Sequence, residues 1–245
     1  MAILEVHNLT KSFGGLMAIN NLSLSVDEGE LRCIIGPNGA GKTTLFGLIS
    51  GYLQPDKGHI LFRGEVLNGL SVDQISRRGI GRKFQSPTVF GELTVLENLQ
   101  VAIQGKSSLR RLIFTRNSQA SAMVEEILGL IELTEKRHLP AQALSHGEKQ
   151  WLEIGMVLAT RPRLLLLDEP TAGMTPAETH KTAQLIQHIS QQMTTVVIEH
   201  DLKFIREIGQ IVTVLHYGAI LAHGLIDEIA QNQQVRQAYL GTKVL

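Results

Sequence analysis

The sequence has little of several features that define whole classes of protein. It contains one cysteine, Cys33, so no disulfide can form within the chain, and this usage suits a reducing compartment. Its 23 basic residues are balanced by 23 acidic ones, so no overall field attracts nucleic acid or an anionic lipid surface. The apolar run that begins at Ile211 ends at His216, far short of the roughly 20 residues that cross a bilayer. The opening MAILEVHNLT also lacks the pattern of a signal peptide.

The composition that is present is that of an ordinary folded protein. The chain has 245 residues, of which 43% are apolar and 19% are charged, and these values argue against disordered, collagenous and coiled-coil classes. The length fits one large domain or two closely joined ones. We therefore expect residues 1–245 to form one domain that does not cross a membrane by itself.

Patterning divides this domain into stretches of different character. The segments LEVHNLTKSFGG and LSLSV alternate apolar and polar residues, which predicts half-exposed antiparallel strands. The runs LRCIIG, LLLL and TTVVIE are apolar and alternate with helical segments, which predicts a mostly parallel sheet flanked by helices. Between 93 and 160, apolar residues recur at helical spacing. We place an inserted α-helical subdomain at 88–160, and an α/β core with an antiparallel β subdomain at 1–87 and 161–245.

The segment GPNGAGKT, residues 36–43, matches the P-loop pattern G-x-x-x-x-G-K-[ST]. It lies between a predicted strand and a predicted helix at 42–50, which is the context that the motif requires. Its glycines let backbone N–H groups turn toward an anion, and the helix N-terminus adds partial positive charge. We expect Lys42 to reach the β- and γ-phosphates of a nucleotide and Thr43 to hold Mg²⁺. The fold class is therefore predicted to be that of a P-loop NTPase.

The segment LLLLDEP places two carboxylates at the end of a buried strand. Ligands of open α/β sheets bind beyond the carboxyl ends of the strands. Asp168 is therefore expected to support the magnesium ion, and Glu169 to orient or deprotonate an attacking water. Without the P-loop, such a pair would more often be a turn with a helix cap. Together, the two motifs predict a triphosphatase that uses ATP or a similar nucleotide.

Three further features indicate which triphosphatase this is. The segment LSHGEKQ lies between the P-loop and the carboxylates, Gln85 lies in GRKFQSP, and His200 lies in VIEHD. The combination resembles the ATP-binding subunits of ABC transporters over essentially the whole chain. The resemblance implies that His200 contacts the γ-phosphate, that Gln85 touches the metal or water, and that Phe13 stacks on adenine. A phenylalanine between strands is equally often part of a core.

The segment LSHGEKQ also has a physical interpretation. Ser145 and Glu148 are three residues apart before an apolar helix, which predicts a capping box, and Gly147 keeps the approach to that helix open. The resemblance implies that this helix start serves the ATP held by an opposite subunit. His146 and Glu148 depart from the commoner LSGGQ pattern, so Ser145 and Gly147 are the expected contacts.

These inferences define one set of site residues. The predicted catalytic residues are Glu169, His200 and Gln85, and the predicted ligands of Mg²⁺ are Thr43, Gln85 and Asp168. The predicted ATP-binding residues are Phe13, Gly36, Asn38, Gly39, Ala40, Gly41, Lys42, Thr43, Thr44, Ser145 and Gly147.

A later segment, TAGMTPAET, departs from the family pattern. The resembling family usually has an aspartate at the subunit interface where this chain has Thr175. Thr175, Pro176 and Glu178 still predict a capped helix start. The missing carboxylate predicts communication between two ATP sites that differs from the family norm.

The resemblance also implies partners and a cargo. Segments such as DEPTAGMT and TVLHYG are similar to ATP-binding subunits of urea importers, which are related to branched-chain amino-acid and short-amide importers. The implied partners are membrane permease subunits, a second ATP-binding subunit in a head-to-tail dimer and, indirectly, a substrate-binding protein, at the cytoplasmic side of the plasma membrane. Residues 86–99 are a candidate permease contact, or are buried within the helical subdomain.

Two other functions are weighed against this one. A soluble ABC ATPase that acts on nucleic acid or ribosomes usually has two ATPase units or long coiled coils, and this chain has one P-loop and no sustained heptads. A P-loop kinase for a small metabolite would leave Ser145, Gly147 and His200 unexplained.

Overall fold

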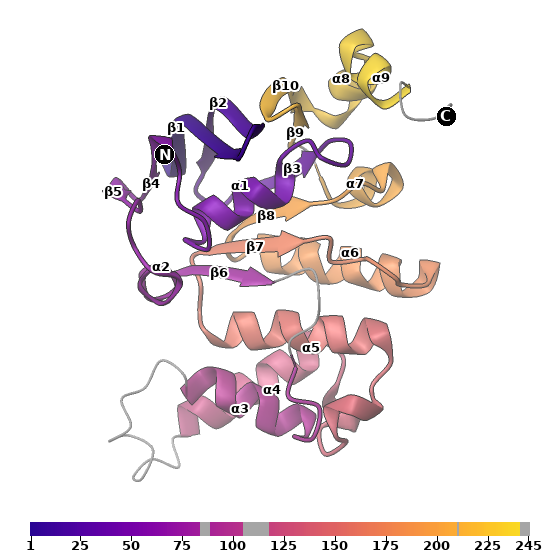
Figure 1. Cartoon of the computed structure of the whole chain (residues 1–245). Helices are drawn as coiled ribbons and strands as arrows, with labels where there is room; N and C mark the ends of the chain where they lie inside the picture. Colours follow the sequence, from indigo (N-terminus) through magenta and orange to yellow (C-terminus); the bar gives the residue numbers. More distant parts are fainter. Residues whose placement is uncertain (84–88, 105–117, 210, 241–245) are drawn as a thin grey trace.

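The computed structural model describes residues 1–83, 89–104, 118–209 and 211–240. They form two sheets and a set of helices (Figure 1). The first sheet is antiparallel, with strand order β2-β1-β4-β5. Its strands are β1 (Ala2–Phe13), β2 (Leu16–Asp27), β4 (Lys57–Phe62) and β5 (Glu65–Val66). The alternation of apolar and polar residues in the N-terminal segments therefore predicted their structure correctly.

The second sheet has six strands in the order β10-β9-β3-β8-β7-β6. All of its pairs are parallel except β10 with β9, which is antiparallel. This arrangement confirms the predicted fold class of a mostly parallel sheet with a separate antiparallel one. The strands are β3 (Leu31–Ile35), β6 (Ile80–Lys83), β7 (Leu164–Asp168), β8 (Thr194–Ile198), β9 (Ile211–His216) and β10 (Ala219–Leu225).

The six-stranded sheet is buried on both faces, as the leucines of β7 show. Leu164 and Leu166 pack with the antiparallel sheet and helix α1 (Lys42–Ile49). Leu165 and Leu167 belong to the other core cluster, which also contains side chains of the helices on the opposite face. Because successive residues of a strand point to opposite sides, a continuous apolar run suits a sheet covered on both sides.

The helices follow the boundaries that capping chemistry sets. In α5 (His146–Ala159) and α6 (Pro176–Ser190), Ser145 and Thr175 form the predicted capping boxes with Glu148 and Glu178. Asp201 caps α7. The remaining helices are α2 (Val72–Arg78), α3 (Val95–Gln104), α4 (Ser118–Leu130), α7 (Leu202–Ile208), α8 (Ile226–Gln231) and α9 (Gln233–Leu240), with short 3₁₀ turns at Thr134–Lys136 and Ala141–Ala143.

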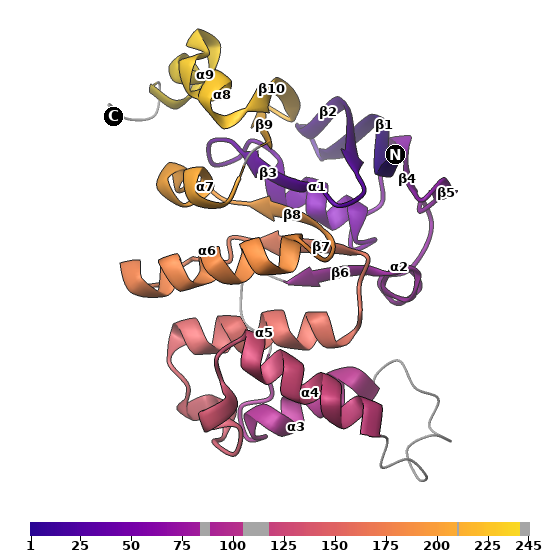
Figure 2. The ribbon, with the colours of Figure 1, turned by 180° about the vertical axis from the view of Figure 1, so that it is seen from behind.

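Helices α3, α4 and α5 form a block below the six-stranded sheet, with α5 lying between the sheet and the other two (Figures 1 and 2). A buried pair helps to join this block to the sheet, since Lys83 Nζ on β6 lies 3.9 Å from Glu153 Oε2 on α5. The described part of 88–160 is thus mainly helical, while the exact division between subdomains stays a prediction. Among the described helices, none is long and apolar enough to span a bilayer.

Candidate functional site

The loop between β3 and α1 has the backbone shape that only glycine adopts easily. Gly41 precedes α1 with a φ of +102°, and a Cβ placed there would lie 2.4 Å from the backbone oxygen of Ala18. At Gly36, an added Cβ would lie 2.2 Å from the oxygen of Leu215. No side chain caps α1 and no acidic residue lies in its first turn. The partial positive charge of this helix start is therefore open to an anion.

Lys42, the first residue of α1, lies over this loop. Its Nζ donates hydrogen bonds to the carbonyl oxygens of Gly36, at 2.7 Å, and Pro37, at 3.1 Å. Burial lowers the pKa of Lys42, and the charges of Glu169, Asp168 and Glu199 act against that shift. The lysine is thus within electrostatic reach of three carboxylates at the carboxyl ends of β7 and β8. Asn38, Gly39 and Thr43 are exposed around it, while Thr44 is half-buried.

Asp168 is the last residue of β7 and is fully buried. Its Oδ2 accepts a hydrogen bond of 3.0 Å from Nη2 of Arg82, on the neighbouring strand β6. Burial raises the pKa of Asp168, and the charge of Arg82 opposes that rise. Within the described residues, the other oxygen, Oδ1, is buried without a hydrogen-bond partner.

A buried carboxylate oxygen without a partner is costly unless a ligand satisfies it. Asp168 Oδ1 and the exposed hydroxyl of Thr43 are oxygen donors of the kind that Mg²⁺ prefers. In the part of the chain that the structure describes, no cluster of three or more His, Cys, Asp or Glu could hold a metal by itself. The donors present therefore fit a magnesium ion that is held largely by a nucleotide and only partly by the protein.

Glu169 and His200 follow β7 and β8, whose carboxyl ends lie side by side because the two strands are parallel. Glu169 has a left-handed backbone, with a φ of +45°, and its N–H donates to the oxygen of Ile198 at 2.9 Å. Its Oε1 lies 3.8 Å from Nδ1 of His200. The Glu169 carboxyl is mostly buried, whereas His200 is 62% exposed. A carboxylate and an imidazole thus lie close together at the carboxyl ends of β7 and β8.

Phe13 ends β1, is 46% exposed and has Lys11 Nζ 5.6 Å from its ring centre. It is therefore outside the core. Gln85 falls outside the described residues, so its placement stays a prediction.

The start of α5 is built differently from the start of α1. The Ser145 hydroxyl is exposed, accepts from the N–H of Glu148 and donates to Glu178 Oε1 at 3.3 Å. Gly147 is buried, and an added Cβ would lie 2.5 Å from the same Oε1. Gly147 thus makes room for a side chain of its own subunit. The sequence interpretation of Gly147 as an open approach did not include this contact.

His146 links the start of α5 to the loop after β7. Its Nε2 lies 3.0 Å from the carbonyl oxygen of Ala172, and its ring packs against Gly173. One of the two residues that depart from the commoner pattern thus links the start of α5 to the loop after β7 within one subunit.

Comparison with known proteins places this site in a family. The sequence profile of the family described as "ABC transporter" matches residues 19–172. The chain belongs to the ABC transporter ATP-binding family. It is 41% identical to the "High-affinity branched-chain amino acid transport ATP-binding protein BraF" of Pseudomonas aeruginosa and 39% identical to LivG, of the same description, from Escherichia coli, over 98% of each chain. A solved structure, the "ADP conformation of MJ1267, an ATP-binding cassette of an ABC transporter", is 32% identical with a TM-score of 0.85, over 98% of this chain and 99% of that one.

As a member of the ABC transporter family, the chain is an ATPase subunit whose ATP hydrolysis is coupled to transport.

Sequence reasoning assigned no role to Arg82 or Glu199, although Arg82 holds Asp168 and Glu199 lies buried next to His200. It also missed the C-terminal helix α9, which lines a cavity of about 510 Å³ beside Pro37, Asn38, Gly39 and Ala40. A signal for Glu199 was its position at the end of a buried strand directly before His200.

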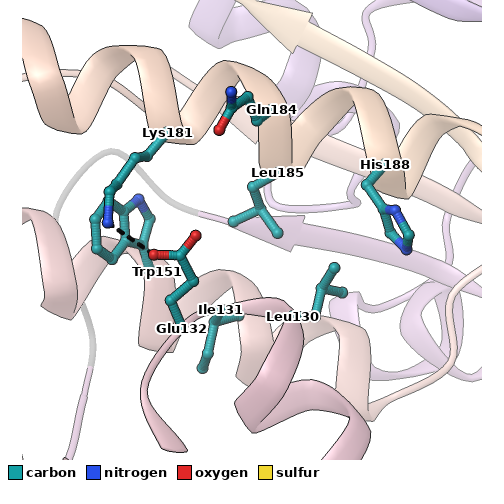
Figure 3. A pocket seen from close by; sticks show the side chains of 8 residues that line it. All are labelled: Leu130, Ile131, Glu132, Trp151, Lys181, Gln184, Leu185 and His188. Atoms are coloured by element: carbon teal, nitrogen blue, oxygen red, sulfur yellow. Dashed lines mark hydrogen bonds and ion pairs between the residues drawn. The ribbon is translucent and has the colours of Figure 1, made fainter.

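A second hollow, of about 160 Å³, lies between α4, α5 and α6, away from the P-loop (Figure 3). Lys181 crosses it, with its Nζ 2.7 Å from Glu132 Oε2 and 5.7 Å from the ring centre of Trp151. Trp151 in turn donates to Thr182 Oγ1 at 2.9 Å. None of the predicted site residues lines this hollow, so we interpret it as part of the contact between the helical block and the core.

Proposed function

We propose that this chain powers an importer for a small nitrogen compound, by hydrolysing ATP beneath membrane permease subunits. The cargo that the comparisons support best is a branched-chain amino acid, since that is what the names of BraF and LivG state. Urea, which the segments DEPTAGMT and TVLHYG favour, is the competing cargo. The observation that carries the ATPase part is the convergence of Lys42, Asp168 and Glu169 at one edge of the sheet.

The proposed chemistry assigns a task to each of these side chains. The N–H groups of 36–44 and Lys42 bind the β- and γ-phosphates, while Phe13 stacks on the adenine. Glu169 takes a proton from the water as its oxygen attacks the γ-phosphorus, and the bond to the ADP oxygen breaks. His200 donates to a γ-phosphate oxygen and so keeps it oriented.

The same proposal includes a metal. Thr43, Asp168 and Gln85 would hold Mg²⁺, which neutralises charge on the phosphate oxygens when bound. Arg82 keeps the Asp168 side chain fixed through its hydrogen bond of 3.0 Å to Oδ2, so that Oδ1 is the oxygen left for the ion or for a water bound to it.

We further propose a head-to-tail dimer with a second ATP-binding subunit. In it, Ser145 and Gly147 of one subunit face the ATP bound by the P-loop of the other. The exposed Ser145 supports this arrangement. It lies at the start of α5, whereas the P-loop of the same subunit leads into α1. Closure upon ATP would move the permeases, and hydrolysis would release them.

The proposed permease contact lies on the helical block. Phe90 is 50% exposed, Leu139 43% and Val101 40%. Within the predicted contact at 86–99, Val95 and Leu99 are buried, whereas Phe90 is exposed. A partner that covered Phe90, Val101 and Leu139 would remove their apolar surface from water. The chain would thus be held at the cytoplasmic face of the plasma membrane through its permeases.

Uptake of labelled leucine and labelled urea, measured in parallel, tests this function. Cells lacking the native gene would carry the native chain, Lys42→Ala, or the control Lys57→Ala, which removes a lysine that is exposed on β4. We expect Lys42→Ala to abolish leucine uptake and Lys57→Ala to preserve it. Loss of urea uptake alone would keep the ATPase and replace the cargo. Loss of neither would contradict a role in importing either compound.

A further inference from the structure

Glu199 is a buried carboxylate that the proposed mechanism has not used. It follows β8 directly and is 0% exposed. An ionised carboxylate at such a position is retained only where hydrogen bonds replace its hydration. Its contacts therefore indicate what it is there to hold.

Three donors from two different loops converge on this carboxylate. Thr171, in the loop after β7, donates to Oε1 from its backbone N–H at 3.1 Å and from its hydroxyl at 2.5 Å. The N–H of His200 donates to Oε2 at 3.0 Å. The backbone of Glu199 donates in turn to the oxygen of Ile34 at 3.3 Å, on the strand that leads into the P-loop. One residue thus ties β3 to the segments after β7 and β8.

The same carboxylate also orients the His200 ring. Nδ1 of His200 lies 3.6 Å from Glu199 Oε2 and 3.8 Å from Glu169 Oε1. Both carboxylates therefore lie near the Nδ1 side of the ring. The other ring nitrogen, Nε2, is then the one that can meet a phosphate oxygen.

We propose that Glu199 is a positioning residue for ATP hydrolysis, which fixes both His200 and the loop that carries Glu169 in their working geometry. This inference rests on the proposed roles of Glu169 and His200. It adds that their alignment depends on a carboxylate, with two acceptor oxygens, at position 199.

The loop after β7, which Glu199 holds through Thr171, also contacts the start of α5. Thr171 is followed by Ala172, whose oxygen lies 3.0 Å from Nε2 of His146. A shift of Thr171 would therefore disturb the side of the subunit that is proposed to face the second ATP. Glu199 is thus placed to affect both the hydrolytic side of the subunit and the α5 start, which is proposed to face the ATP of a second subunit.

Glu199→Gln in the full chain tests the proposal, because the amide keeps the size of the side chain but replaces one acceptor oxygen with a donor. We expect kcat for ATP hydrolysis to fall about 10- to 100-fold, because small misplacements of reacting groups lower rates by factors of this size. Affinity for ATP, measured with a fluorescent analogue, should stay within about twofold because the P-loop contacts are unchanged. Glu5→Gln is the matched control, since Glu5 Oε2 also lies 3.3 Å from a histidine, His7, but on the antiparallel sheet.

A double-mutant cycle with His200→Ala separates positioning from general destabilisation. If Glu199 acts largely through His200, Glu199→Gln should change single-turnover rates much less in the His200→Ala background than in the native one. A full, additive loss in that background would overturn the part of the proposal that concerns His200. A kcat that stays native, or an ATP affinity that falls in parallel with kcat, would overturn the whole proposal.

Two variants of Thr171 keep the test decisive if Glu199→Gln does not fold. Thr171→Val removes the hydroxyl that donates to Glu199 and preserves the shape, whereas Thr171→Ser restores a donor. We expect a lower kcat for the valine variant and recovery for the serine variant; equal kcat values would overturn the proposal.

Glu169→Gln, measured alongside, separates this inference from the function on which it rests. If Glu169→Gln retains turnover, the proposed hydrolytic site is wrong. If it loses turnover while Glu199→Gln does not, only the positioning role is wrong.

Discussion

The starts of α1 and α5 are two helix N-termini in one chain, and they are built in opposite ways. The start of α1 follows a glycine loop, has no side-chain cap and lies beside Lys42. The start of α5 is closed by the Ser145–Glu148 capping box and has a second acid, Glu178, next to its serine. The first is therefore a nearly complete anion site by itself, whereas the second offers one hydroxyl amid negative charge.

This difference indicates that the two helix starts have different roles in the proposed dimer. A single subunit has what it needs to bind ATP at α1, because the N–H groups, the lysine and the oxygen donors for a metal are all present. At the α5 start the Ser145 hydroxyl is bonded to Glu178, and the charge of Lys136 is paired with Glu148. The α5 start can contribute only when another subunit brings a phosphate to it, which would make hydrolysis depend on assembly.

The change expected to have the largest effect is Glu169→Gln, in the half of the site that contains α1. It leaves the phosphate-binding groups intact and removes the proposed base. We expect ATP binding to be preserved and hydrolysis to slow by about 10²- to 10⁴-fold. Steady-state turnover and ATP affinity, measured on the same preparation, check this; near-normal turnover would refute the role of Glu169.

Lys42→Ala breaks the α1 site itself. Hydrogen bonds to charged groups contribute roughly 1.5–3 kcal/mol, so ATP affinity should fall about 10- to 150-fold. Isothermal titration of the isolated chain with ATP measures this. An unchanged affinity would mean that the phosphates bind elsewhere.

Ser145→Arg is the corresponding change at α5. It should leave ATP binding by the single chain within about twofold of the native value, while blocking closure and lowering turnover by about tenfold or more. Turnover at increasing protein concentration is the measurement. Native turnover in this variant would contradict the composite site.

The smallest effects are expected from alanine at the two glycines. At Gly41 an added Cβ meets the backbone oxygen of Ala18 at 2.4 Å in a left-handed conformation, which should cost roughly 1–3 kcal/mol of unfolding free energy. At Gly147 it meets the flexible end of Glu178 at 2.5 Å, and alanine favours a helix, so the cost should stay below about 1 kcal/mol. Urea unfolding compares them. Equal losses would contradict the view that only the α1 loop is rigidly packed.

Much of this comparison was accessible from sequence, because local chemistry sets it. The P-loop spacing, the apolar run before Asp168 and the capping boxes at Ser145 and Thr175 each depend on residues close in the chain. The role of Phe13 was ambiguous, because the sequence pattern of β1 does not tell whether this ring lies in a core. The structure shows that the side chain is exposed. Gly147 was only partly understood, because the side chain it accommodates, Glu178, comes from a different helix.

The sequence by itself determined that a phosphate loop is followed, at the ends of two later strands, by two carboxylates and a histidine. Only the tertiary structure decided which groups hold those carboxylates. Arg82 reaches Asp168 across 86 residues of sequence, and Thr171 reaches Glu199 across 28. These pairs follow from the parallel register of β6, β7 and β8. A buried charge takes whichever donor that register brings within reach, and local sequence patterns do not encode which donor it will be.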